Sequence, residues 1–231
     1  MKIAADFSKR EIVHSRSLPW TASPMKGVDR RPLDRVGDEV ARATTIVRYA
    51  AGSKFSPHVH TGGEEFIVLE GVFQDEHGDF PAGSYVRNPP QSSHTPRSDE
   101  GCIIMVKLWQ FQPDDRLHVS IDLHTIQKET LDASQQIETS SLYKDAFEDV
   151  SLLHIPANAI YSDIAQGGIE FFVLEGSVTE QKETLTQYSW LRLPMGTSFK
   201  LIAGNEGAKV WIKKGHLIDV DKQIMRVNNS A

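Results

Sequence analysis

The chain has 231 residues, of which 39% are apolar and 24% charged, with a formal net charge of −6. This length suits one large domain or two of roughly 110 residues, each able to bury a core. The acidic balance, without any lysine- or arginine-rich run, argues against nucleic-acid binding.

Membrane insertion and secretion also find no support in the sequence. No segment approaches the roughly 20 consecutive apolar residues that a membrane-spanning helix requires. The first residues contain no apolar core or cleavage pattern of a signal peptide. Cys102 is the only cysteine, so no internal disulfide can form. We therefore expect a cytoplasmic protein that binds neither membrane nor nucleic acid.

The predicted elements are mostly short strands. Residues 1–40 are polar and interrupted by proline and glycine, which predicts short extended pieces and loops. Brief β-rich runs follow at 44–50, 64–71, 83–88, 102–111 and 118–126. Residues 125–150 indicate short helix or irregular linker. The β pattern then resumes at 150–156, 169–178, 188–194, 198–203 and 208–214. Many short strands without a long amphipathic helix predict an all-β sandwich or barrel.

An internal repeat divides the chain. GGEEFIVLEG (62–71) and GGIEFFVLEG (167–176) agree at eight of ten positions, with an offset of 105 residues. SYVRNPPQSSH (84–94) and SWLRLPMGTSF (189–199) agree at four of eleven in the same register. Such a repeat indicates duplicated structural units. We predict two copies of one small β-barrel: residues 1–118, which include an extended N-terminal arm, and residues 119–231.

Four residues of the first copy form a candidate metal site. His58 and His60 are two residues apart on a predicted strand, so their side chains face the same side. Gly62 and Gly63 provide a tight turn, after which Glu64 points back toward the histidines. His94 follows on a separate strand that barrel closure could bring alongside. Three imidazoles and one carboxylate are enough to hold a divalent transition metal.

The second copy tests this assignment. At the matching positions the four candidate ligands are replaced by Asp163, Ala165, Ile169 and Phe199. Neighbouring residues persist, since Glu65, Glu70, Arg87 and Ser93 match Glu170, Glu175, Arg192 and Ser198. This favours Glu64 over Glu65 as the carboxylate ligand. It also favours a packing or ion-pair role for Arg87 over a substrate clamp, and predicts that the second copy binds no metal.

Other polar residues have weaker patterns. Cys102 is either an oxidant-sensitive thiol or a small buried side chain, and its apolar strand favours burial. His118 and His124 share one face of residues 118–126, which we interpret as an exposed face rather than a second metal site. His77 lies in the turn DEHGD and is expected to be solvated.

The candidate ligands carry a family resemblance. Gly52, His58, His60, Glu64 and Gly71 match the first motif of the cupin superfamily, G-x5-HxH-x3-E-x6-G. Its second motif is partly met, because Gly78, Pro81 and Gly83 precede His94 at a longer interval. Within that superfamily, residues 48–102 resemble the cupin module of ChrR-type anti-sigma factors.

The resemblance implies a jelly-roll β-barrel in each half, so that the chain would be a bicupin. It implies one metal, commonly zinc, in the first half and a degenerate second half. It also implies a link to oxidative-stress signalling through an alternative sigma factor. The helical zinc-binding domain that grips the sigma factor carries a His-x3-Cys-x2-Cys pattern, which does not occur in this sequence. A sigma factor is therefore a doubtful partner.

Two functions remain open. In the first, which the resemblance favours, the chain is a sensor or regulatory protein with a protein partner. Its zinc ion is then fully coordinated by four protein ligands. In the second, iron, manganese or nickel with the same ligands serves an oxygenase or isomerase that acts on a small molecule. No general base at a recognisable spacing identifies a reaction, so catalytic residues are unassigned. Self-association as a homodimer is compatible with either function.

Overall fold

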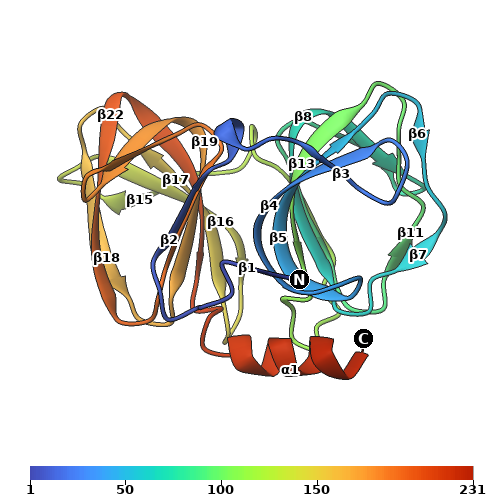
Figure 1. Cartoon of the computed structure of the whole chain (residues 1–231). Coiled ribbons are helices and arrows are strands. Elements are labelled where there is room, and N and C mark those ends of the chain that lie inside the picture. Colours follow the sequence, from blue (N-terminus) through green and yellow to red (C-terminus); the bar gives the residue numbers. More distant parts are fainter. Residues whose placement is uncertain (231) are drawn as a thin grey trace. The chain divides into compact units, whose positions relative to one another are not determined.

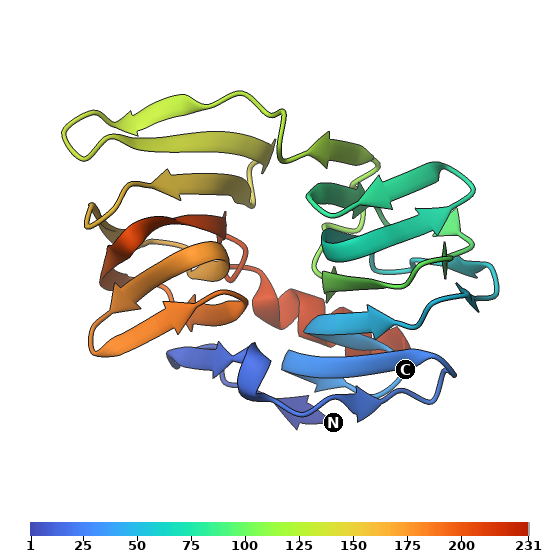
Figure 2. The same ribbon diagram turned by 90° about the horizontal axis from the view of Figure 1, so that it is seen from above.

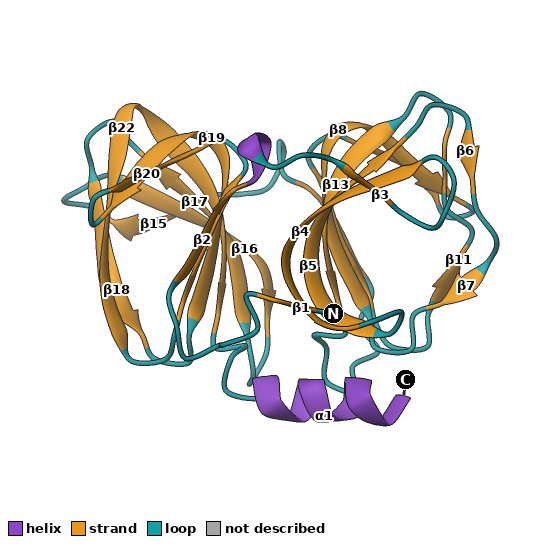
Figure 3. Ribbon diagram, viewed as in Figure 1, coloured by secondary structure: helices purple, strands orange, loops and turns teal. Residues whose placement is uncertain are grey.

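The computed structural model describes residues 1–230 and confirms the predicted all-β class (Figure 1). Apart from one short 3-10 turn, η1 (Ser15–Ser17), the described residues contain a single helix, α1 (Val220–Ser230), as Figure 3 shows. No helix within residues 1–230 combines the length and the apolar character needed to cross a bilayer. The chain divides into two compact units.

The first unit contains residues 1–5, 19–125 and 221–230. Its main antiparallel sheet runs in the order β1 (Lys2–Ile3), β4 (Val28–Gly37), β5 (Ala41–Tyr49), β13 (Cys102–Leu108), β8 (Glu64–Asp75), β10 (Ser84–Asn88) and β14 (Val119–Asp122). Shorter strands pair at its margins: β3 (Thr21–Ala22), β6 (Ser53–Lys54), β9 (Gly78–Pro81) and β12 (Arg97–Ser98). A separate pair consists of β7 (His58–Val59) and β11 (Ser93–His94).

The second unit contains Asp6–Leu18 and Ile126–Val220. Its sheet runs in the order β15 (Glu129–Asp132), β16 (Ile137–Lys144), β17 (Asp149–Ile155), β22 (Thr197–Lys214), β19 (Ile169–Glu180), β21 (Ser189–Leu193) and β2 (Glu11–His14). In addition, β18 (Ile160–Ala165) pairs with β22, and β20 (Glu183–Thr186) pairs with β19. Seen from above in Figure 2, the strands of each unit curl around an interior.

Strand pairing follows the same register in both units. In the first, Val68 on β8 faces Ile104 on β13, which faces Val47 on β5. In the second, Val173 on β19 faces Val210 on β22, which faces Leu153 on β17. Because facing residues of antiparallel strands point to the same side, positions in one unit can be compared directly with positions in the other.

One strand carries an irregularity that the second unit repeats. On β4 a β-bulge lies between Pro32 and Asp34, opposite Thr45 and Thr44 of β5. The corresponding bulge on β16 lies between Ser141 and Tyr143. A bulge adds one residue and so changes which face the following side chains occupy. It therefore sets the direction of the residues that follow Pro32.

Apolar side chains of the inward faces form a core in each unit. In the first, Phe66 and Val68 are both buried, as the alternation along β8 predicts, and Phe73 packs against Phe66. The core of the second unit includes the largely aliphatic cluster around Phe171, Leu191, Phe199 and Val210. Burial of these side chains supplies the main driving force for each sheet to close.

The sequence-based expectations were wrong in two segments. Residues 125–150 were expected to be helical or irregular, but they form β15 and β16, whose pairing with β17 outweighs the weak local pattern. Helix α1 was not expected at all. Its buried residues, Val220, Gln223 and Val227, have helical spacing. The segment is too short and too polar for this pattern to be recognised in the sequence.

A buried polar cluster joins α1 to the first sheet. Arg42 and Asp34 are both fully buried, and their side chains form an ion pair at 3.2 Å. The Arg42 Nε donates to Gln223 of α1 at 2.8 Å, and its Nη2 donates to Gln110 at 3.3 Å. A buried guanidinium depends on such partners, because an unpaired buried charge is costly.

Replacing Asp34 with alanine should therefore lower the free energy of unfolding by about 3 kcal/mol, because Arg42 would keep its charge but lose this carboxylate partner. The matched control is Asp29→Ala on the same strand. Asp29 pairs with Arg48 at 2.7 Å, but both side chains are partly exposed, so its loss should cost below about 1 kcal/mol. Urea denaturation of both variants provides the comparison, and equal losses would contradict the role given to the buried pair.

Candidate metal centre

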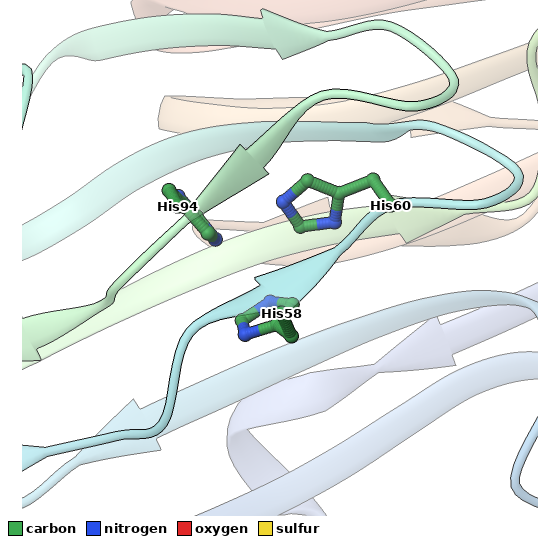
Figure 4. A group of neighbouring side chains, drawn as sticks. All are labelled: His58, His60 and His94. Atoms are coloured by element: carbon green, nitrogen blue, oxygen red, sulfur yellow. The ribbon is translucent and has the colours of Figure 1, made fainter.

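Three histidines meet where β7 pairs with β11. His94 faces His58 across this pair, and His60 follows β7 on the same side as His58. The ring centroids are 4.5 Å apart for His60 and His94, and 4.9 Å apart for each of the other two pairs. One ring nitrogen from each lies within 4.8 Å of the other two. Figure 4 shows the three rings turned toward one another.

Glu64, the fourth predicted ligand, lies beside two of the three histidines. Its Oε2 is 3.4 Å from His60 Nε2 and 3.6 Å from His94 Nε2. The three-histidine cluster defined by the 4.8 Å separation does not include it. Asn88 on the neighbouring strand β10 donates a hydrogen bond of 3.3 Å to the same oxygen, which fixes the carboxylate in place.

The turn between His60 and Glu64 depends on two glycines. A Cβ at Gly62 would lie 2.1 Å from the Trp109 ring, and one at Gly63 would lie 2.4 Å from the Phe111 ring. Gly63 also has a φ of +79°, a conformation that side chains disfavour. Glycine at these positions therefore allows two aromatic rings to pack over the turn, which holds Glu64 close to the histidines.

Hydrogen bonds to two of the histidines leave their Nε2 atoms available. His94 Nδ1 lies 3.0 Å from Asp75 Oδ2, and His58 Nδ1 lies 3.3 Å from the Ser56 carbonyl oxygen. Because a carbonyl or an ionised carboxylate only accepts, Nδ1 must carry the proton in both rings. In the neutral tautomer, Nε2 then presents a lone pair, which is the arrangement found in histidines that bind metals.

The surroundings shift the pKa values of these groups in different directions. Burial lowers the pKa of His60. Burial also opposes the charged form of His94, but the hydrogen bond to Asp75 and the charge of Glu64 together raise its pKa. For Asp75, burial is likewise outweighed, here by hydrogen bonds from His94 and from the His77 amide, so its pKa is lowered. Asp75 is therefore ionised at neutral pH.

The donor set fits a divalent transition metal. The Nε2 atoms of His60 and His94 are buried and have no hydrogen-bond partner, although both point toward the Glu64 carboxylate. Unsatisfied buried nitrogens are costly, and a cation among them would satisfy both and offset the Glu64 charge. Imidazole nitrogens with one carboxylate oxygen suit zinc, iron, nickel and manganese.

A cavity of about 340 Å³ adjoins the histidines. His58, His60 and Glu64 contribute to its wall. The remaining lining is mixed, with apolar residues from β5 and β13 together with Tyr49, Trp109, Arg30 and Arg35. His58 is also exposed to solvent, unlike the buried His60 and His94. The candidate ligands are therefore reachable by a small molecule.

The equivalent region of the second unit is apolar. Asp163 on β18 faces Phe199 on β22, in the register that His58 and His94 have in the first unit. Ala165, Ile169 and Phe199 are all buried in the core, with Phe199 in contact with Phe171 and Tyr161. Among the described residues, the only group of three ligand-type side chains close enough to share an ion is the histidine cluster of the first unit.

Glu65 and Arg87 lie away from the cavity. Neither contributes to its wall, and both are buried in an ion-pair cluster. Arg87 Nη1 lies 3.7 Å from Glu65, and its Nη2 lies 3.0 Å from Asp115. The Tyr85 hydroxyl donates to Glu65 at 2.6 Å. In the second unit Glu170 similarly accepts from Trp190 at 3.0 Å, so the retained residues serve packing and pairing.

The remaining residues considered from the sequence form no second site. Cys102 is buried in the core of the first unit, and burial raises the pKa of its thiol to about 11. His77 and His118 are exposed. His124 is exposed as well, and one of its ring nitrogens lies 3.2 Å from the Ala82 carbonyl oxygen.

Sequence reasoning missed Asp75, Asn88, Tyr49 and Arg30. Asn88 could have been found, because the second copy has Leu193 at its position, as expected for a residue lost with the ligands. Asp75 matches Glu180, which retains the acidic character, so the repeat gives no signal. Tyr49 and Arg30 lie on strands whose repeat is not visible in the sequence.

Comparisons with known proteins agree with the all-β fold. The family model for the ChrR cupin-like domain matches residues 8–112. A proposed dioxygenase from Nostoc punctiforme has a similar structure, with a TM-score of 0.75 and 16% identity, covering 91% of this chain and 84% of that chain. The protein has the cupin fold. No curated protein is similar enough to match this chain.

Two further structural neighbours of this chain differ in their described activity or ligand. A bacterial pirin from Escherichia coli, in complex with nickel(II), has a TM-score of 0.63 and 14% identity, and covers 89% of this chain and 98% of that chain. A variant of the oxalate decarboxylase from Bacillus subtilis has a TM-score of 0.61 and 10% identity, covering 89% and 77%. At these identities the likeness shows the fold alone.

The raised pKa of Cys102 predicts slow thiol chemistry. Relative to its ordinary value of 9.0, a pKa of about 11 reduces the thiolate fraction at pH 8 by about a hundredfold. Labelling with a chromogenic disulfide reagent should therefore be at least that much slower in native protein than in urea-unfolded protein. Rapid labelling of the native protein would show that the thiol is accessible and would reopen an oxidant-sensing role.

Proposed function

We propose that the first unit binds one divalent metal ion through His58, His60, His94 and Glu64. We further propose that this metal serves a reaction on a small molecule bound in the adjoining cavity. The observation that carries the proposal is the pair of buried, unpartnered Nε2 atoms beside a carboxylate, at the wall of a 340 Å³ cavity. A purely structural site would be closed to ligands, whereas His58 is exposed here.

A bound metal would supply Lewis acidity toward an oxygen atom of the substrate, and a redox-active one could also support reaction with oxygen. Iron, manganese and nickel accept ligands beyond the four that the protein offers, which leaves room for a substrate. Zinc, expected from the family resemblance, fits the same donors in a closed site. We favour the open site and an oxygenase reaction, the activity proposed for the Nostoc neighbour, with isomerisation as the alternative.

The surrounding residues would prepare the site. Asp75 holds the proton on His94 Nδ1, so that Nε2 remains a ligand. Asn88 orients Glu64. Burial, with Glu64 nearby, raises the pKa of Tyr49, so its hydroxyl remains neutral in the cavity and can donate a hydrogen bond. Apolar side chains of β5 and β13 line part of the remaining space.

A regulatory function is the second candidate, because residues 8–112 match the ChrR cupin-like domain. In this case the metal, zinc, would report on oxidants or metal supply, and the response would pass to a protein partner. The raised pKa and burial of Cys102 argue against that thiol as the sensing group. Metal release, rather than thiol oxidation, would then be the signal.

Metal analysis of protein purified without an affinity tag separates the candidates. Iron, manganese or nickel, with bound water that small molecules displace, is expected for the enzyme. Zinc that resists exchange and binds no small molecule would favour the regulatory protein. Protein that binds no divalent metal at micromolar concentration would contradict both.

Replacing His60 or Glu64 with alanine should abolish stoichiometric metal binding. It should also lower the melting temperature of the metal-loaded protein, because metal binding contributes to folding stability. The controls are Asp163→Ala and Phe199→Ala, at the positions of the second unit that correspond to His58 and His94, which should leave metal content unchanged. Elemental analysis with thermal denaturation makes the comparison, and full metal content in either ligand variant would refute the assignment.

Replacing Asp75 with asparagine should weaken metal binding by roughly ten- to a hundredfold. The neutral amide lacks the charge with which the Asp75 carboxylate holds the proton on His94 Nδ1. Asp79→Asn is the control, since Asp79 is an exposed residue of the same hairpin that bonds Gln74 rather than a histidine. Competition with a metal-binding dye measures both affinities. Equal affinities would show that Asp75 does not support the ligand.

A further inference from the structure

The cavity beside the histidines is lined by an arginine, Arg30, whose side chain has no partner among the described residues. Arg30, on β4, lines the cavity and is only partly exposed. Within residues 1–230 its side chain forms no hydrogen bond or ion pair. The other arginines of this strand have partners: Arg31 lies over the Trp20 ring, and Arg35 donates to the carbonyl oxygens of Gly37 and Asp38. A partly buried guanidinium without a counter-charge is unfavourable.

A second arginine increases this positive charge. The bulge between Pro32 and Asp34 turns Arg35 to the same side as Arg30, since Arg30 faces Val47 and Arg35 faces Ala43 on β5. Burial lowers the pKa of Arg35, and the positive charge of Arg30 lowers it further. The two guanidinium groups are therefore close enough to repel each other, and an anion between or beside them would relieve this.

The second unit lacks this feature, as it lacks the histidines. The register places Thr139 at the position of Arg30, because Thr139 faces Leu153 as Arg30 faces Val47. Lys144 takes the position of Arg35, but it is neutralised by Asp149 at 2.8 Å. At these two positions of the described strands, an unpaired cation thus occurs in the unit with the metal-ligand set and not in the other, which links Arg30 to the function of that cavity rather than to the barrel frame.

We propose that Arg30 binds the carboxylate of a small, mainly apolar organic acid, whose remaining part lies along the apolar wall beside the histidines. Planar guanidinium groups bind carboxylates through paired hydrogen bonds. The wall that would receive the apolar part includes Val28, Val47, Phe55, Val106 and Leu108. The volume of about 340 Å³ suits a ligand of this size.

A single negative charge fits the cavity better than a phosphate. Glu64 and Glu39 also line it, and a doubly charged group would be repelled by both. This inference rests on the proposed function only in treating the cavity as the substrate site. The recognition of a carboxylate by Arg30 does not itself require the metal.

The test is isothermal titration of the as-isolated protein with benzoate, phenylacetate and 4-methylpentanoate, and with the corresponding neutral amides. At least one acid should bind, and at least tenfold more tightly than its amide. Arg30→Gln should weaken binding of that acid by roughly ten- to a hundredfold, the loss expected for a charged hydrogen-bonded pair. Arg30→Lys retains the charge but not the planar pair of donors, so its affinity for the acid should lie between those of the wild type and Arg30→Gln.

Arg31→Gln is the matched control, because it makes the same chemical change at the adjacent residue, whose side chain stacks on Trp20; acid binding should be unchanged. Without ligand, Arg30→Gln should melt at the same temperature as the wild type or higher, since it removes an unpaired charge. A lower melting temperature would instead indicate a structural role for Arg30. Any one of three results would overturn the inference: a lower melting temperature of Arg30→Gln, equal binding of acids and amides, or no acid binding at millimolar concentration.

Metal content measured on the same samples separates this inference from the proposed function. If the protein holds no metal but prefers acids in an Arg30-dependent way, the metal proposal fails and the carboxylate site stands. If metal is bound stoichiometrically but acids show no preference, only the carboxylate site fails.

Discussion

Alternation of side chains along a β-strand is the constraint on which this site depends. Glu64 and Glu65 are adjacent in β8, yet one lies beside His60 and His94 and the other lies in the cluster of Tyr85 and Arg87. A shift of one residue in the pairing of β8 would exchange them and place the wrong carboxylate in the cavity. The cluster around Glu65, repeated around Glu170, holds the register by burying charges that must be paired.

Comparison of the two units indicates that a polar interior lowers the stability of a barrel. In the second, Phe199, Ile169 and Ala165 fill the region of the candidate site, and apolar packing is continuous from Tyr161 to Phe171. In the first, the same region holds buried histidine nitrogens without partners, and Arg30 without a counter-charge. Residues arranged for binding commonly reduce stability in this way. The second unit therefore shows the apolar interior that the same strand arrangement has when its side chains are not arranged to bind a ligand.

The sequence predicts the site better than its surroundings. His58, His60, Glu64 and His94 follow from strand alternation and from their joint replacement in the second copy, and the structure brings the three histidines together with Glu64 beside two of them. The pairing of β2 with β21 joins residues about 175 positions apart, and no local pattern encodes such a contact. Helix α1 and β15 are likewise decided by tertiary packing rather than by propensity.

Arg30 shows why the rest of the cavity is hidden from sequence comparison. The offset of 105 residues holds for β8 and β19 but reaches 109 between Arg30 and Thr139, because insertions separate the matching strands. Only the hydrogen-bonded register restores the correspondence. Once restored, it shows that the bulge of β4 and β16 is common to both units, whereas the charges that it orients are not. The backbone geometry is thus common to both units, whereas the replacement of Arg30 by Thr139 accompanies the replacement of the candidate metal ligands. The proposed carboxylate ligand would account for the change at Arg30, as the proposed metal ion would account for the change in the four ligands.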